Sequence, residues 1–269
     1  SRMEQLKRCR EGNIGVPLLM IRVPMLSELD ELVQVADCSL NSELVTLRAL
    51  DKAAEAHGVV HNVVLMADLG DLREGYFNYD ELVETAETVE RELSHLHLAG
   101  IGTNLGCYGS VMATEDKMQE LADLAIRVEK SIGRELEIVS GGATSSLMGV
   151  FGGYMPEKIN MLRIGAAALA GSLEGMKTCY GYSEMDALRD DAFTLEAQVV
   201  EVKKKASHPI GQLGVDAFGK KQTYVDRGER TRALVAVGRA DYGEISDLVP
   251  TIEGMEVIGA SGDHTILDI

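Results

Sequence analysis

Two glycine-rich segments carry residue types that could bind an anion. The first covers 138–146 and reads IVSGGATSS, and the second covers 161–166 and reads MLRIGA. In each, a short apolar run ends in small residues before an expected helix, where free backbone N–H groups and the helix dipole favour a phosphate. Arg163 lies two residues before the second glycine, which predicts that a group beyond the phosphate is also held.

The predicted phosphate site combines hydroxyl side chains with backbone amides. The alternative interpretation is an ordinary strand-to-helix loop that needs small residues only for packing. The residues expected to bind the phosphate-bearing group are Ser140, Gly141, Gly142, Thr144, Ser145, Gly165 and Ala166.

The elements that must position these segments alternate regularly between strand and helix. Polar and glycine signals recur after nearly every strand, as at the active face of a (β/α)8 barrel, although a doubly wound open sheet could also contain six strands. Expected caps are Asn41–Ser42, Asp80 and Thr114, the last followed by an acidic first turn. Strands are predicted over 18–23, 37–41, 61–68, 98–104, 136–141 and 160–165, and helices over 43–57, 80–95 and 114–132.

The pattern changes after about residue 190. Residues 193–202 alternate with period two, and 231–237 and 255–258 are short and strand-like, which predicts a β-rich second domain. The expected organisation is an α/β domain over 1–189, an incomplete (β/α)8 TIM-type barrel without its first strands, and a β domain over 190–269. Residues 176–190 are the expected hinge.

Composition limits the possible partners. The 269 residues are 45% hydrophobic and carry a net charge of −17, and no basic cluster exceeds Lys203–Lys205, which argues against nucleic acid. Neither a membrane span nor a signal peptide is visible. The four cysteines lack metal or disulfide spacing, which predicts free thiols, a cytoplasmic location and no metal.

The two ends predict a fragment. The chain begins at Ser1 in an expected helix, and it stops inside the strand-like run 265–269.

Several segments resemble the alanine racemases, and in particular the branch of ornithine racemases and predicted amino-acid racemases. The string DLGDLREGYF at 68–77 is highly specific, whereas the tripeptide RIG at 163–165 alone would be weak. The resemblance covers the whole chain. Its other segments are 40–44, 100–104, 214–219, 238–241 and 263–264.

This resemblance implies a PLP-dependent (pyridoxal 5′-phosphate) racemase of fold type III, acting on a small amino acid that is ornithine-like or alanine-like. It also implies a head-to-tail homodimer in which the β domain contributes to the partner's site. By resemblance, Arg163 faces the pyridine nitrogen, and Asn104 stands where alanine racemases carry a histidine that contacts this arginine and the ring. Arg73 reaches the phenolic oxygen or the substrate carboxylate, a task that suits a guanidinium, and Asp68 is the residue expected to position it. The alternative is that Arg73 only pairs with Asp68, Asp71 or Glu74 around it.

Two departures from the family pattern bear on catalysis. Arg239 occupies the position of the usual catalytic tyrosine, and Tyr242 lies three residues further on. Asp263 and His264 are therefore the candidates for the second acid/base, because histidine titrates near neutrality. A structural or surface His264 is the alternative, and Asp263 could instead bind the distal amine of a basic substrate.

The second departure is the Schiff-base lysine, which the family places at the end of the first barrel strand. None of the lysines in this chain falls at the end of a predicted barrel strand. The chain alone is therefore expected to lack racemase activity. Two other functions stay open: a non-catalytic PLP-binding protein, and another fold-type III enzyme such as a D-amino-acid aldolase or a decarboxylase.

Overall fold

The computed structural model describes residues 2–169, 174–181, 188, 193–215, 219 and 221–269. The chain divides into two compact units, Ser1–Ala192 and Phe193–Ile269. Of the hinge expected over 176–190, the first residues belong to helix α8 (Glu174–Tyr180), and 182–187 and 189–190 lie outside the described residues.

The first unit is built on a six-stranded parallel sheet. Its strands follow one another in sequence order, so every carboxyl end meets the same edge. This arrangement confirms an incomplete barrel in place of a doubly wound sheet, whose strand order would reverse. The strands are β1 (Leu19–Met20), β2 (Cys38–Asn41), β3 (His61–Ala67), β4 (Leu96–Thr103), β5 (Ile138–Ala143) and β6 (Met161–Arg163).

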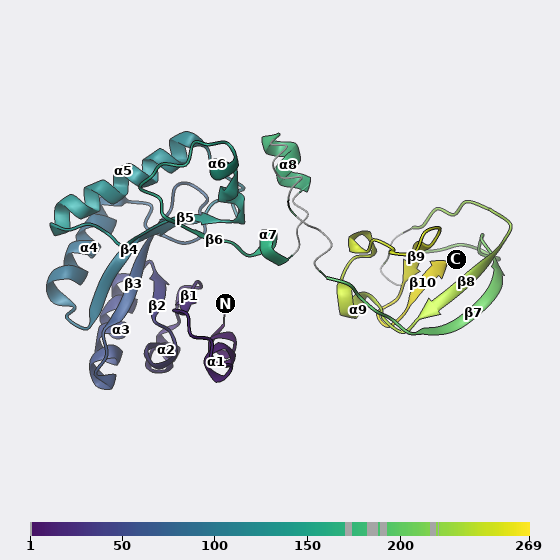
Figure 1. The fold of residues 1–269 in the computed structure, drawn as a ribbon, viewed down its shortest axis with the longest axis horizontal. Helices are drawn as coiled ribbons and strands as arrows, with labels where there is room; N and C mark the ends of the chain where they lie inside the picture. The colour runs from purple at the N-terminus through teal and green to yellow at the C-terminus, as the bar shows by residue number, and fades with distance from the viewer. Residues whose placement is uncertain (1, 170–173, 182–187, 189–192, 216–218, 220) are drawn as a thin grey trace. The chain divides into compact units, whose positions relative to one another are not determined.

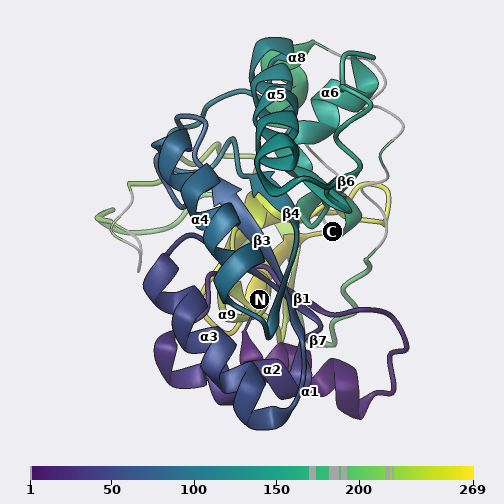
Figure 2. The ribbon, with the colours of Figure 1, turned by 90° about the vertical axis from the view of Figure 1, so that its left-hand side faces the viewer.

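Helices cover the outer face of this sheet, as Figure 1 shows, and α3, α4 and α5 follow one another along it in Figure 2. In α5 the residues at 118, 121, 122, 125 and 128 are buried, and the helix ends at Gly133 with φ +78°. The helices are α1 (Met3–Glu11), α2 (Leu29–Val35), α3 (Leu44–His57), α4 (Tyr79–Glu92), α5 (Glu115–Ile132), α6 (Leu147–Phe151) and α7 (Ala166–Leu169), with α8 and the 3-10 turns η1 (Leu26–Glu28) and η2 (Thr144–Ser146).

Two of the expected caps are wrong. Asn78, not Asp80, caps α4, because its side chain accepts the Asp80 N–H at 3.0 Å. Helix α3 follows Glu43 without a side-chain cap, so the Asn41–Ser42 pair has no capping role. Thr114 precedes α5 as expected, and its hydroxyl binds Asp116 instead of a backbone amide.

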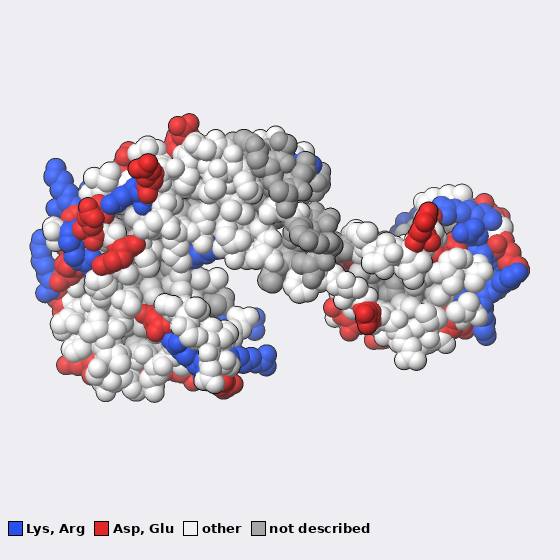
Figure 3. Space-filling view, in the orientation of Figure 1, with Lys and Arg blue, Asp and Glu red and all other residues white. Residues whose placement is uncertain are grey.

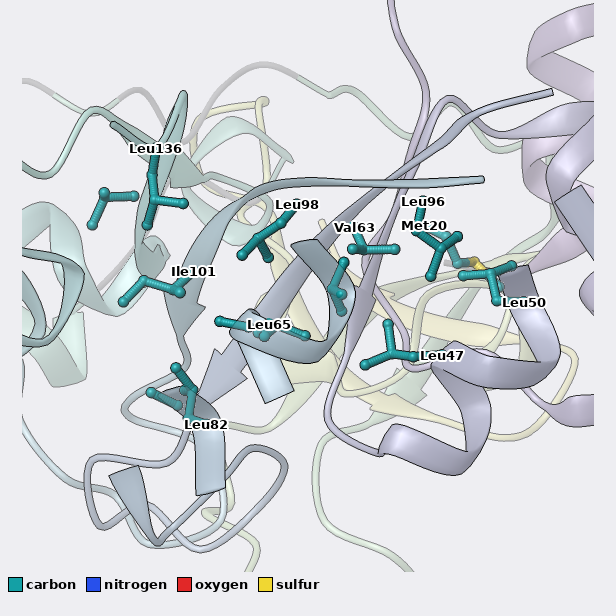
Figure 4. Packing of buried hydrophobic residues seen from close by; sticks show 14 of the residues in the cluster. Met20, Leu47, Leu50, Val63, Leu65, Leu82, Leu96, Leu98, Ile101 and Leu136 are labelled. Carbon is teal, nitrogen blue, oxygen red and sulfur yellow. The ribbon is translucent and has the colours of Figure 1, made fainter. Parts of the chain in front are cut away.

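The core lies between the sheet and these helices. Leu47 and Leu50 of α3 and Val63 and Leu65 of β3 are fully buried members of this core, and Figure 4 labels all four. A smaller cluster of Cys38, Leu40, Val64 and Met66 forms the opposite, inner face. Because its central strands are apolar on both faces, the sheet holds its polar groups mainly at its ends.

Charged side chains of opposite sign alternate over the outer helices. Figure 3 shows this mixture on the side of α4 and α5. Arg134 pairs with Glu90 at 2.8 Å, and Arg127 pairs with Asp80. These exposed pairs join neighbouring helices and contribute little individually.

The second unit is a four-stranded antiparallel sheet of order β7-β8-β10-β9. The strand expected over 193–202 begins only at Val199, because 193–198 have no regular structure. Among the described residues, no helix of either unit is long and apolar enough to cross a membrane. The elements are β7 (Val199–Ala206), β8 (Glu229–Val235), α9 (Arg239–Tyr242), η4 (Ile245–Asp247), β9 (Glu256–Ala260) and β10 (Thr265–Asp268).

Candidate functional site

Arg163 is the last residue of β6 and lies at the edge of the sheet where the carboxyl ends of the strands meet. Its guanidinium donates to the Ser140 hydroxyl of β5 and, at 2.9 Å, to the Thr103 carbonyl of β4. Both acceptors are neutral, and no carboxylate of the described residues contacts this charge directly. Burial lowers the pKa of Arg163 to about 10, an effect opposed by the charge of Glu74 and reinforced by Arg73.

Asn104 follows β4 directly and is 7% exposed. Its side-chain Nδ2 is buried and has no hydrogen-bond partner among the described residues. An unsatisfied buried donor costs about 1–3 kcal/mol, so a further polar group at this edge would be stabilising.

The predicted phosphate segments meet around Thr144. Its Oγ1 accepts the backbone N–H groups of Gly165 and Ala167 over long distances of 3.3 and 3.4 Å. Gly142 has φ +114°, and a Cβ there would approach Ser146 Oγ to 2.5 Å. The segments are thus close-packed at Gly142, while no atom of the described residues lies within 4 Å of a Cβ built at Gly165. This opening can take an anion against two amides that are only weakly bound.

The two serines after Thr144 differ from each other. Ser145, expected to bind phosphate, donates its hydroxyl to the Leu105 carbonyl at 2.6 Å and so holds the loop after β4. Ser146 Oγ is buried and has no hydrogen-bond partner in the part of the chain that the structure describes. Sequence reasoning did not select Ser146, although it ends the same TSS run.

Arg73 lies on a tightly closed loop after β3. The Asp68 carboxylate accepts the N–H groups of Gly70 and Leu72, and Leu72 has φ +58°. At Gly75 a Cβ would lie 2.6 Å from the Asp68 nitrogen, so only glycine fits. Asp68 is therefore occupied by backbone, and the expectation that it positions Arg73 is wrong.

The partners of Arg73 are Glu74 and Cys107. Both carboxylate oxygens of Glu74 accept N–H groups of the guanidinium, and Cys107 Sγ lies 3.1 Å from Nη1. The Glu74 carboxylate raises the pKa of Arg73 above its usual value. Sequence reasoning kept the pairing with Glu74 only as the alternative to a functional role.

Asp71 joins the loop after β3 to the loop after β4. Its buried carboxylate accepts the backbone N–H groups of Cys107 and, at 3.1 Å, Val111, and its carbonyl accepts that of Gly109. This bridge keeps Cys107 beside Arg73. It links residues up to 40 positions apart, and the sequence carries no signal for it.

Asp263 and His264 belong to the second unit, in the turn between β9 and β10. Both side chains are exposed, and Ser261 holds the turn by accepting both backbone N–H groups. The preceding β8–α9 connection packs so closely that a Cβ at Gly238 would lie 2.3 Å from the Gly262 oxygen. Tyr242 is engaged elsewhere, because its hydroxyl binds Thr265 Oγ1 at 2.6 Å. Arg239 pairs with Glu244.

Lysines are absent from the carboxyl ends of β1–β6 in the part of the chain that the structure describes. Of the lysines in the first unit, Lys158 is the nearest in sequence to one of these strands, but it precedes β6 and pairs with Glu129 at 2.5 Å. The other lysines lie on helices or in the second unit: Lys7, Lys52, Lys117, Lys130, Lys177, Lys203, Lys204, Lys205 and Lys221, while Lys220 lies outside the described residues.

The described residues contain no group of three or more His, Cys, Asp or Glu side chains that could hold a metal ion.

Known proteins are similar to this chain in sequence and in fold. The chain is 43% identical over 269 residues to the ornithine racemase of Acetoanaerobium sticklandii, covering 100% of this chain and 74% of that protein. It is 37% identical over 269 residues to the lysine racemase of Thermotoga maritima, covering 100% of this chain and 73% of that protein.

Among solved structures, an alanine racemase from Streptomyces lavendulae aligns with a TM-score of 0.70 at 18% identity, over 100% of this chain and 69% of that one. The alanine racemase of Clostridium difficile 630 aligns with a TM-score of 0.67, also at 18% identity, over 100% and 68%. At this identity the likeness concerns the fold. The family model described as alanine racemase, N-terminal domain, matches residues 1–172. The chain therefore belongs to the alanine racemase family, the fold-type III amino-acid racemases.

Proposed function

We propose that the first unit is the PLP-binding domain of an amino-acid racemase that acts on a basic amino acid. The observation that carries this proposal is the Arg163 guanidinium, whose two hydrogen bonds go to neutral oxygens of Ser140 and Thr103. Asn104, the residue after Thr103, adds a buried Nδ2 without a partner among the described residues. A heteroaromatic ring with polar substituents would satisfy both groups. The ornithine and lysine racemases among the relatives support the substrate class.

The residues around Thr144 fit the phosphate of this cofactor. A phosphate oxygen would accept the Gly165 and Ala167 N–H groups, whose present bonds to Thr144 are 3.3 and 3.4 Å long. Ala166 belongs to the same turn, and the backbone of Gly141 and Gly142 shapes it. When bound, PLP supplies an electron sink that makes the Cα–H bond of an attached amino acid acidic.

Side chains of this protein would tune the ring, bind the substrate and transfer the proton. Arg163 keeps a positive charge beside the ring nitrogen and so disfavours its protonation, which limits how far negative charge at Cα is stabilised. Arg73 would bind the substrate carboxylate. His264, with Asp263 beside it, would move a proton at Cα as the second acid/base, contributed to the partner's site in a head-to-tail homodimer.

Calorimetry with pyridoxamine phosphate tests the cofactor site, because this analogue binds without a lysine. We expect Arg163→Leu and Thr144→Val each to weaken binding by about tenfold, the loss of one charge-assisted contact. Arg127→Leu on α5 is the matched control and should leave binding unchanged. No binding by the unaltered chain would overturn the proposal.

The lysine positions support a second part of the proposal, that these 269 residues alone form no Schiff base with PLP. Borohydride reduction followed by peptide mass mapping should then find no adduct at one defined lysine. A single adduct at one described lysine would contradict this part only. A non-catalytic PLP carrier would bind pyridoxamine phosphate equally well, so chiral chromatography of L-ornithine and L-lysine, with a protein that includes the lysine, separates it from a racemase.

A further inference from the structure

The proposed function leaves one acidic residue at the site without a role. Glu74 has a side chain that is only 17% exposed, and its two oxygens accept the Nε and Nη2 donors of Arg73. The Nε and Nη2 donors form one of the edges through which a guanidinium binds a carboxylate by two parallel hydrogen bonds. The remaining nitrogen, Nη1, faces the Cys107 thiol at 3.1 Å. An internal carboxylate thus occupies the place on Arg73 that a substrate carboxylate would need.

Glu74 also acts on the second arginine of the site. Its charge raises the pKa of Arg163 against the effect of burial, and it holds the pKa of Arg73 above its usual value. The single, largely buried negative charge of Glu74 therefore stabilises the positive charges of both Arg73 and Arg163. A carboxylate in such a place is costly to leave without a partner.

We propose that Glu74 selects substrates that carry a second cationic group. The substrate carboxylate replaces Glu74 on Arg73, and the released Glu74 pairs with the distal ammonium of a diamino acid. One internal ion pair is exchanged for two ion pairs with the substrate, so no charge is left unpaired. A monoamino acid would release Glu74 without offering it a partner, and the site would disfavour it for that reason. This inference rests on the proposed function.

A purely structural role for Glu74 makes a different prediction. If Glu74 only orients Arg73, its loss should weaken every ligand that has a carboxylate, and by the same factor. If Glu74 selects the distal ammonium, its loss should act in opposite directions on ligands with and without that group. Paired ligands that differ only in the ammonium separate the two roles.

The test measures dissociation constants by calorimetry for three stable probes. Pyridoxamine phosphate reports the cofactor site alone. The reduced conjugates N-phosphopyridoxyl-L-ornithine and N-phosphopyridoxyl-L-norvaline add a carboxylate and a three-carbon side chain, which ends in an ammonium only in ornithine. None of the three needs the Schiff-base lysine, so the full 269-residue chain can be used.

The unaltered chain should bind the ornithine conjugate more tightly than the norvaline conjugate. In Glu74→Gln this preference should fall by about tenfold, because the ornithine conjugate loses its partner and the norvaline conjugate no longer releases a bare charge. Glu74→Asp keeps the charge and should retain more of the preference. Glu92→Gln removes the same charge from an exposed pair with Arg48 on the outer helices and should change nothing.

Several results would overturn the inference. Equal affinities of the unaltered chain for the two conjugates would do so without any variant, even if Glu74→Gln failed to fold. Equal losses for both conjugates in Glu74→Gln would show the structural role, and loss of the preference in Asp263→Asn with Glu74 intact would assign the ammonium to Asp263. Each of these leaves the proposed PLP site of a racemase standing if pyridoxamine phosphate binds, and only equal affinities also count against a basic substrate. Failure of all three probes overturns both the inference and the proposed site.

Discussion

The two units of this chain bury their apolar side chains to very different extents. In the first unit, strands and helices enclose a continuous core that includes Leu47, Leu65 and Leu98. In the second unit, Ala233 and Val235 are the buried apolar residues among those described, while Val200 and Val202 of β7 are exposed. The first unit has the core of an independent domain, and the second has a sheet with an apolar surface that a stable domain would cover.

The same difference extends to the residues with proposed chemical roles. Arg163 and Thr144 of the first unit are held by hydrogen bonds to neighbouring strands or loops. Asp263 and His264 of the second unit are exposed, and the bonds that fix their turn come from their backbone. The groups proposed to bind a cofactor thus lie in the unit with the larger core, and the groups proposed to move protons lie in the less buried unit. Three predictions test this contrast.

The largest effect should come from the core of the first unit. Leu65→Ala removes a fully buried side chain from β3 and should lower the free energy of unfolding by about 3–5 kcal/mol. Val202→Ala, at a side chain 56% exposed on β7, should change it by less than about 0.5 kcal/mol. Urea unfolding followed by circular dichroism measures both. A cost for Val202→Ala as large as that for Leu65→Ala would show that β7 is covered in solution.

A second effect depends on pH and also belongs to the first unit. His61 is buried against Ser39, with 3.0 Å between Nε2 and Oγ, and burial lowers its pKa from 6.5 to about 4. The unfolded chain binds the proton at higher pH, so the free energy of unfolding should fall by about 3 kcal/mol between pH 6.5 and pH 4.

Equilibrium unfolding across this pH range checks the prediction. His61→Gln should flatten the dependence attributable to this residue, whereas His264→Gln in the exposed turn should leave it unchanged. The interpretation is wrong if both variants flatten it equally.

The smallest effect should be confined to the second unit. Thr265→Val removes hydrogen bonds to the Tyr242 hydroxyl at 2.6 Å and the Val237 carbonyl at 2.8 Å. We expect a loss of about 1–2 kcal/mol. Hydrogen exchange should detect it in β8 and β10 and not in β3 or β4. Faster exchange in β3 would mean that the two units unfold together.

Much of the first unit could be predicted from its sequence, because parallel strands buried on both faces read as short apolar runs. The run at 61–68 predicts β3 (His61–Ala67) almost to the residue. Helices α6 and α7 have five and four residues, too few for a helical period to stand out. The cap at Asn78 was missed because Asp80, two residues later, has an equal propensity for the N-cap position. In the structure the backbone N–H of Asp80 is instead the donor to Asn78.

Glycine spacing and family motifs drew attention to Gly142 and Arg163, and the structure places both at the carboxyl ends of neighbouring strands. What could not be predicted depends on contacts between distant segments. The Asp71 bridge to Val111 and the Ser145 bond to Leu105 join loops that only the folded sheet brings together. The pairing of Arg73 with Glu74 is local, yet sequence alone does not decide which of several neighbouring acids an arginine selects.

The strand order of the first unit bears on how the chain folds during synthesis. Each strand from β2 to β6 pairs with the strand made just before it, so an edge of the newest strand is always available to the next one. Every βα unit that leaves the ribosome can dock at once, without waiting for a distant segment. The sheet can grow in the order of translation, and the edge proposed to bind an anion is completed only when β6, which carries Arg163, has been made.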